Sequence, residues 1–192
     1  MKQIKEDRLL AEVYNYVQQG KGRNSQVTDV ENNLVKKTPI NGGTFSDVEL
    51  KKLTFMANNK NNIFVKFHEI TPHYAITDKL DLSVRTPIWK WIKNNIVTDN
   101  EKDTVGKYGG ESSHDPDALG EFIAKDILSP TPNMGVFETL EHYSINDPIA
   151  SLLVDYMLRL STVKHWPVST FDIHIDNVGL DKKDKKLKVF DF

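Results

Sequence analysis

The sequence contains no cysteine. This absence excludes disulfide bonds, metal sites built from thiolates and a cysteine nucleophile, and it is compatible with a reducing compartment. The chain also lacks an apolar run long enough to span a bilayer, and residues 1–8 contain no continuous hydrophobic segment of the kind that signal peptides carry. We therefore expect a soluble, cytoplasmic protein with no membrane partner.

A strong excess of charge of either sign is missing as well. The formal net charge is −2, so contacts to a phosphate backbone are not expected to dominate binding, and nucleic acid is not the expected partner. Hydrophobic residues make up 39% of the 192 residues, which is enough for one sizeable core or two small lobes and excludes a disordered chain. The sequence shows no internal repeat and no low-complexity tract.

The most informative stretch lies close to the end of the chain. Residues 170–179 and 187–192 form two short apolar segments with carboxylates at their ends, and the hydrophilic run 181–186 joins them. Apolar segments separated by a polar turn of this kind predict a β-hairpin. The carboxylates at its open end are suitable ligands for a metal ion.

A glycine-rich segment and a lysine-bearing strand stand near the start. Residues 20–27 have the form G-x-G-x-x-S-x-V, in which backbone N–H groups can approach phosphates because glycine has no Cβ; an ordinary solvated loop is the alternative. Residues 33–37 predict a short strand that places Lys36 and Lys37 on opposite faces. From the strand pattern alone, both would be ordinary solvated lysines at a strand end.

Residues 46–57 predict an amphipathic helix. Ser46 and Glu49 have the spacing of a capping box, and Val48, Leu50, Leu53 and Met56 recur on one side. From this spacing alone, Glu49 would do no more than close the capping box.

Other segments follow the usual periodicities. Residues 62–70 and 73–81 predict two strands joined at Thr71-Pro72, and residues 98–117 predict a polar loop. Helices are expected over residues 6–18, 87–97, 115–128 and 147–160, the last opening with an acidic cap and proline. His68 and His73 are expected at a strand edge or turn, without a visible partner.

The order of these features resembles the protein-kinase-like fold. The form Asp172-x-His-x-x-Asn177, followed by two strands and Asp191-Phe192, is similar to the kinase catalytic loop and metal-binding D-F-G element. The segment resembles atypical kinases, including small-molecule phosphotransferases and the early serine/threonine kinases of podophages. Thr170 and Phe171 replace the usual His-Arg, so regulation through an activation-loop phosphate is not expected.

The resemblance implies a role for each matching residue. Asp172 would accept or orient the substrate hydroxyl, and Asn177 and Asp191 would hold Mg²⁺ on the phosphates of ATP. Lys36, with Lys37 as the alternative, would hold those phosphates. Glu49 would pair with this lysine and orient it, or it would only close the capping box; both interpretations stay open. The resemblance further implies that the nucleotide contacts Gly20, Gly22, Ser25 and Val27 in the glycine-rich turn, Thr77 as gatekeeper, Asp78 and Leu80 in the segment facing adenine, and His174 in the catalytic loop.

The resemblance implies an α+β, two-lobed kinase-like fold. A small antiparallel-sheet N-lobe would cover residues 1–82, and a reduced helical C-lobe would cover residues 83–192, with the nucleotide in the cleft. The implied activity is an ATP- and Mg²⁺-dependent phosphotransferase, in particular a phage-type serine/threonine protein kinase. It would act on host proteins in the host cytoplasm.

Two alternatives remain. The sequence ends at Phe192, before the third residue of D-F-G, the activation segment and the later helices that form a peptide-substrate platform. We expect Asp191, close to this end, to be poorly tethered as a metal ligand. Because the platform for a peptide substrate is missing, a pseudokinase that binds and inhibits a partner protein is an alternative to an enzyme. The second alternative is a hydrolase: if residues 171–178 were an extended strand, Asp172, His174 and Asp176 would share a face as a metal triad.

Overall fold

The computed structural model describes residues 25–40, 42–97, 127–129, 134–167, 173 and 175–191. It is a mixed α+β structure, which confirms the expected class, and its described residues form two compact units. The first unit comprises residues 25–40, 42–58 and Lys66–Lys79, and the second comprises Asn59–Val65 and the described residues from Leu80 onward. The sequence had placed the boundary after residue 82, with residues 59–65 on the N-terminal side.

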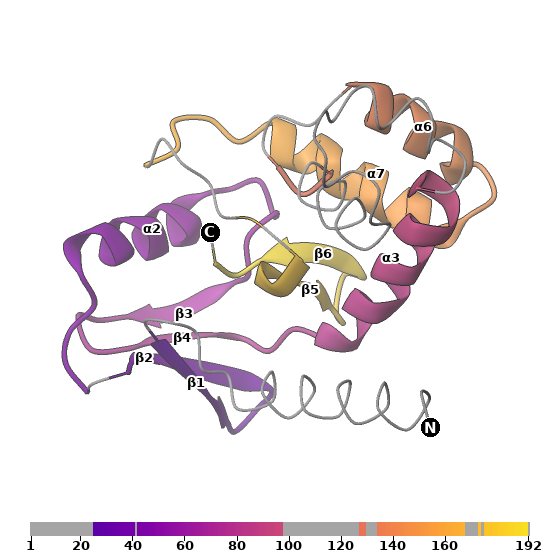
Figure 1. Cartoon of the computed structure of the whole chain (residues 1–192). Coiled ribbons are helices and arrows are strands. Elements are labelled where there is room, and N and C mark those ends of the chain that lie inside the picture. The colour runs from indigo at the N-terminus through magenta and orange to yellow at the C-terminus, as the bar shows by residue number, and fades with distance from the viewer. Residues whose placement is uncertain are drawn as a thin grey trace, which may run out of the picture. The chain divides into compact units, whose positions relative to one another are not determined.

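Four antiparallel strands form the sheet of the first unit. They are β1 (Ser25–Val30), β2 (Leu34–Pro39), β3 (Phe67–Ile70) and β4 (Ala75–Asp78), in the spatial order β1-β2-β4-β3 (Figure 1). Strand β1 pairs with β2 over its whole length, so the predicted loop at residues 25–27 is wrong: these residues are already in the sheet.

The turn between β1 and β2 has a clear local cause. Asn32 and Asn33 have φ values of 64° and 61°. Asparagine tolerates this left-handed conformation better than most residues because its short side chain bonds to the local backbone. The sequence therefore supports a tight reversal at this point, which brings Val30 opposite Leu34 and sets the register of the two strands.

Helix α2 (Asp47–Asn58) follows β2 in the chain and packs on β3. Ser46 caps it as predicted, because its Oγ accepts from the Glu49 N–H at 3.2 Å and its carbonyl accepts from the Leu50 N–H at 2.9 Å. Leu53 and Met56 are buried, but Val48 is 56% exposed, so the buried face of α2 is narrower than the sequence predicted.

The second unit is built from helices around a hairpin. Its helices are α3 (Arg85–Ile92), α6 (Met134–Ser144) and α7 (Pro148–Ser161), and its hairpin consists of β5 (Val178–Asp181) and β6 (Lys186–Val189). Single helical turns lie at Leu82–Val84 (η1), Lys93–Val97 (η2) and Ile175–Asn177 (η4). Helix α7 contacts α3, α6 and β6, and the buried residues that these elements contribute include Ile88, Ile92, Leu140, Leu153, Tyr156, Leu160, Leu187 and Val189.

Helix α6 was not predicted, although a signal was present. Val136, Leu140 and Tyr143 follow helical spacing, and the first two are buried against the rest of the unit. Helix α7 confirms the strongest helical prediction. Within the described ranges, none of the helices combines the length and apolarity that crossing a membrane requires.

The hairpin is held on both edges by other parts of the second unit. Val189 donates its N–H to the Ile63 carbonyl at 2.8 Å and accepts from the Val65 N–H at 2.9 Å, while Asp81 and Leu180 exchange two backbone bonds of 2.8 and 3.0 Å. The predicted strand at residues 62–70 is therefore correct only at its end. Only residues 67–70 form β3, whereas Phe64, in the first part of the predicted strand, pairs with Val189 of β6.

Asp147 links the start of α7 to α3. Its Oδ1 accepts from the N–H groups of Ile149 and Ala150 at 2.8 and 3.0 Å, and its Oδ2 accepts from Trp91 Nε1 at 2.6 Å. Burial by itself would raise the pKa of this carboxyl, but the bonds from Ala150, Trp91 and Ile149 outweigh it and hold the pKa below its usual value. The ionised form is therefore the stabilising form.

Replacing Asp147 by alanine is expected to lower the free energy of unfolding by about 1 to 2 kcal/mol at pH 7, because the cap is lost. The pKa is lower in the folded state, so the ionised cap contributes fully above about pH 4, the ordinary value, and this contribution is lost as pH falls through the lowered one. Chemical denaturation of both proteins at several pH values measures the difference. Glu138→Ala, which removes an exposed acid from α6, is the control, and a difference that stays constant to low pH would contradict the ionised cap.

Candidate functional site

The clearest candidate group in the first unit is an ion pair between β2 and α2. Lys37 Nζ lies 3.2 Å from Glu49 Oε1, and the two side chains are only 11% and 19% exposed. Ser46 caps the first turn of α2 and thereby sets the position of Glu49, while pairing with β1 and β4 sets that of Lys37. The carboxylate therefore orients a largely buried amine.

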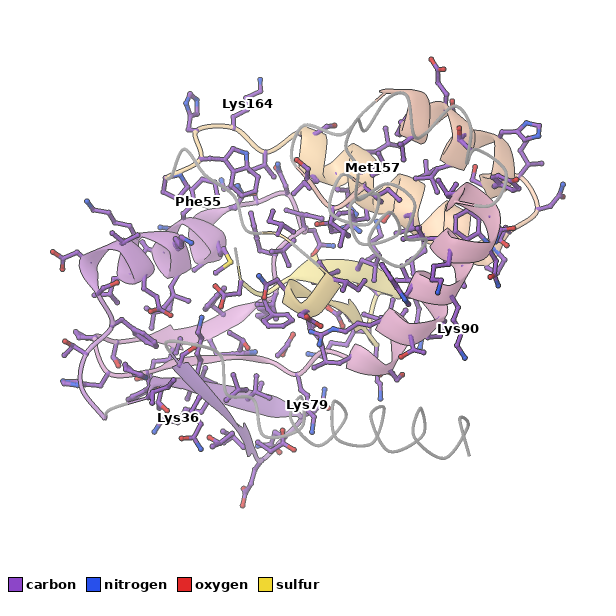
Figure 2. All side chains as sticks on the ribbon, in the orientation of Figure 1. Lys36, Phe55, Lys79, Lys90, Met157 and Lys164 are labelled. Atoms are coloured by element: carbon purple, nitrogen blue, oxygen red, sulfur yellow. The ribbon has the colours of Figure 1, made fainter. Side chains whose placement is uncertain are left out.

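Lys36 has a different environment. Its Nζ lies 4.3 Å from the centre of the Tyr74 ring, a cation–π contact, and Figure 2 labels it on the side of the sheet away from α2. The predicted pairing of Glu49 with Lys36 is therefore wrong, and the fallback residue Lys37 takes that place. The reason is the alternation of side chains along β2, which turns only one of the two lysines toward α2.

The strand register gathers other predicted residues on the face of Lys37. Val27 lies directly opposite Lys37 in β1, and Ser25 precedes it by two residues on the same face. Thr77 in β4 lies opposite Val35, which shares the face of Lys37. Ser25 and Thr77 are 6% and 8% exposed. The structure thus brings four of the predicted side chains to one side of the sheet.

Asp78 lies on the other face of β4, opposite Leu34. Its buried carboxylate is 2.9 Å from His68 Nε2, so His68 has a partner that the sequence did not reveal. The Asp78 N–H donates to the Lys66 carbonyl at 3.0 Å. Leu80, the other residue predicted to face adenine, is buried and belongs to the second unit.

The second unit brings together the two predicted metal-binding segments. Asn177 ends the turn η4 immediately before β5, and Asp191 follows β6 by two residues. The Phe190 N–H donates to the Asn177 carbonyl at 3.0 Å, so the residue before Asp191 is bonded directly to Asn177. Both side chains offer oxygen donors, the ligand type that Mg²⁺ prefers.

The segment before Asp191 is better held than the sequence indicated. The Val189 N–H bonds to the Ile63 carbonyl and the Val189 carbonyl accepts from the Val65 N–H, while the Phe190 N–H bonds to the Asn177 carbonyl. These bonds hold the two residues that precede Asp191, whose own tethering stays a prediction. Cross-chain backbone bonds, which no local pattern encodes, account for the difference.

The metal triad of the hydrolase alternative requires an extended strand at residues 171–178. Residues 175–177 instead form a 3₁₀ turn, and the strand begins only at Val178, so that expectation is wrong where the structure can be described. Asp176 is 64% exposed at its side chain. Among the described residues, no cluster of three His, Cys, Asp or Glu side chains could hold a metal ion.

Four predicted site residues lie outside the described part of the chain: Gly20, Gly22, Asp172 and His174. The predicted helix at residues 6–18, the predicted loop at residues 98–117 and all but the last two residues of the predicted helix at 115–128 lie outside it as well. Their roles stay predictions from the sequence.

Arg85 is a residue that the sequence did not single out. Its Nε donates to the Val178 carbonyl at 3.0 Å, its Nη2 donates to the Asp176 carbonyl, and its side chain is 12% exposed. Burial lowers the pKa of the guanidinium, while the Asp176 carboxylate opposes that shift. An arginine at the first position of a helix carries no sequence pattern that would have predicted these contacts.

Comparison of the chain with protein-family models, curated proteins and solved structures finds no match.

Proposed function

We propose that this protein is an ATP- and Mg²⁺-dependent phosphotransferase, in particular a phage-type serine/threonine protein kinase that modifies host proteins. The observation that carries this proposal is the ion pair between Lys37 and Glu49. A lysine on a strand of the sheet, paired with a glutamate from the helix that follows, is the arrangement that kinases need for activity.

The environment of Lys37 suits phosphate binding. Coulomb interactions are stronger where water is partly excluded, and the Lys37 side chain is only 11% exposed. Glu49 keeps the amine in one place, so less conformational entropy is lost when phosphate binds. Ser25, Val27 and Thr77 share the face of Lys37 and are proposed to contact the nucleotide.

Asn177 and Asp191 fit the role of magnesium ligands. An amide oxygen and a carboxylate are hard donors, and the bond between Phe190 and Asn177 holds their segments together. Mg²⁺, when bound, supplies charge neutralisation on the phosphates. Asp172 would accept or orient the hydroxyl of the acceptor protein, a role that rests on the sequence resemblance alone.

Calorimetric titration of the full chain with ATP, with and without Mg²⁺, tests the proposal. We expect binding that Mg²⁺ strengthens, followed by transfer of label from γ-labelled ATP to protein. Magnesium-dependent binding without any transfer would favour the pseudokinase alternative. If millimolar ATP does not bind in either condition, the phosphotransferase proposal is wrong.

A further inference from the structure

Arg85 touches both segments that carry the candidate metal ligands. Its two backbone bonds end on the carbonyls of Asp176 and Val178, the residues on either side of Asn177. Its guanidinium carbon also lies 5.6 Å from the centre of the Phe190 ring, within the range of a cation–π contact. Phe190 directly precedes Asp191, so one side chain contacts the neighbours of both ligands.

We propose that Arg85 is a positioning residue that holds Asn177 and Asp191 in the geometry needed to bind Mg²⁺. This inference rests on the proposed function and extends it to a residue that is not itself a metal ligand. It assigns Arg85 no contact with nucleotide or metal.

The fold explains how Arg85 reaches these carbonyls. Asp81 pairs with Leu180 in β5, and the turn η1 then leads into α3, which begins at Arg85. The close packing of residues 80–82 against β5 requires glycine at position 179. A Cβ at this position would lie 2.7 Å from Leu80 Cβ and 2.9 Å from Leu82 Cδ2. The small residue thus allows residues 80–82 to lie against β5.

Arginine is the side chain that suits this task. Its planar fork donates from several nitrogens in fixed directions, so it can bond two carbonyls and still lie over an aromatic ring. Lysine keeps the charge but has a single flexible amine that cannot reproduce the fork. Outer contacts that orient metal ligands typically contribute about 10- to 100-fold in metal affinity.

The test compares Arg85→Lys with wild type by titrating ATP into the full chain with and without Mg²⁺. We expect the gain in ATP affinity caused by Mg²⁺ to fall by at least about tenfold, while the metal-free affinity stays the same. Arg159→Lys is the matched control. Arg159 lies on α7, is 13% exposed and bonds the carbonyls of Asn62 and Leu187 at 2.9 and 3.0 Å. Leu187 lies four residues before Asp191, and these bonds do not involve residues 176 and 178 or Phe190, which Arg85 contacts.

A loss of folding is separated from a loss of positioning by measuring the melting temperature of each variant. If Arg159→Lys lowers the melting temperature as much as Arg85→Lys yet keeps the full effect of Mg²⁺, the positioning role is supported. If Arg85→Lys also keeps the full effect of Mg²⁺ on ATP affinity, the inference is wrong. Wild-type protein whose ATP binding is insensitive to Mg²⁺ would instead refute the proposed function, so the two failures are distinguishable.

Asp176→Asn provides a second variant that is expected to fold. The contact between Arg85 Nη1 and Asp176 Oδ1 is long, at 3.7 Å, whereas the carbonyls that Arg85 bonds belong to the backbone and remain. We therefore expect Asp176→Asn to keep the effect of Mg²⁺ within about twofold. A loss as large as that of Arg85→Lys would show that charge pairing, and not the backbone contacts, carries the effect, and would overturn the inference.

Discussion

Replacing Asp191 by alanine is expected to lower the rate of phosphoryl transfer on the order of 10³-fold, since loss of one preorganised electrostatic contact costs up to this much. Transfer of a phosphoryl group depends mainly on placement and on neutralising charge, and Asp191 is the proposed carboxylate ligand of Mg²⁺. The fold should survive, because the backbone bonds of Val189 and Phe190 hold this segment without the Asp191 side chain.

Asp181→Ala is the matched control for this experiment. Asp181 lies in the same hairpin but at its closed end, where it pairs with Lys186 and its Oδ1 accepts from the Lys183 N–H at 2.9 Å. Initial rates with γ-labelled ATP and melting temperatures should be measured for both variants. Equal rates for Asp191→Ala and wild type would exclude Asp191 as a ligand that the reaction needs.

Replacing Lys37 by methionine is expected to lower the transfer rate by about 10²-fold, whereas Lys36→Met should change it less than about threefold. The two lysines are adjacent in sequence, and methionine keeps most of the apolar length of each side chain. Only Lys37 is paired with Glu49, while Lys36 lies over Tyr74 on the other face of the sheet. The comparison therefore isolates the position of the amine from the general loss of a positive charge.

Glu49→Gln extends the same test. It removes the charge that orients Lys37 but retains a side chain of similar size at the first turn of α2, which Ser46 still caps. We expect an effect between those of Lys36→Met and Lys37→Met, seen in the rate and in the affinity for ATP. If Lys36→Met is the more damaging lysine variant, the assignment of the phosphate-binding lysine to Lys37 is wrong.

Several features of the fold were predictable because their causes are local. The cap at Ser46, the start of α7 at Asp147-Pro148 and the hairpin around residues 181–186 each depend on residues within one or two turns of chain. Side chains at such short separations reach the same backbone groups in almost any tertiary context. The helical spacing in α6 was equally local, so this helix could have been found from the sequence as well.

The sequence by itself determined that an acid at the start of a helix and a lysine on a strand are available to pair, and that Asn177 and Asp191 lie at the ends of a hairpin. Only the tertiary structure decided that Lys37 takes the pair, that residues 63–65 join β6, and that Arg85 contacts both ligand segments. Strand register and bonds between residues far apart in the chain decide such contacts. Contacts of this kind leave no periodic pattern in the sequence, because the two partners lie far apart along the chain and many residue types of suitable size and polarity could make the same contact.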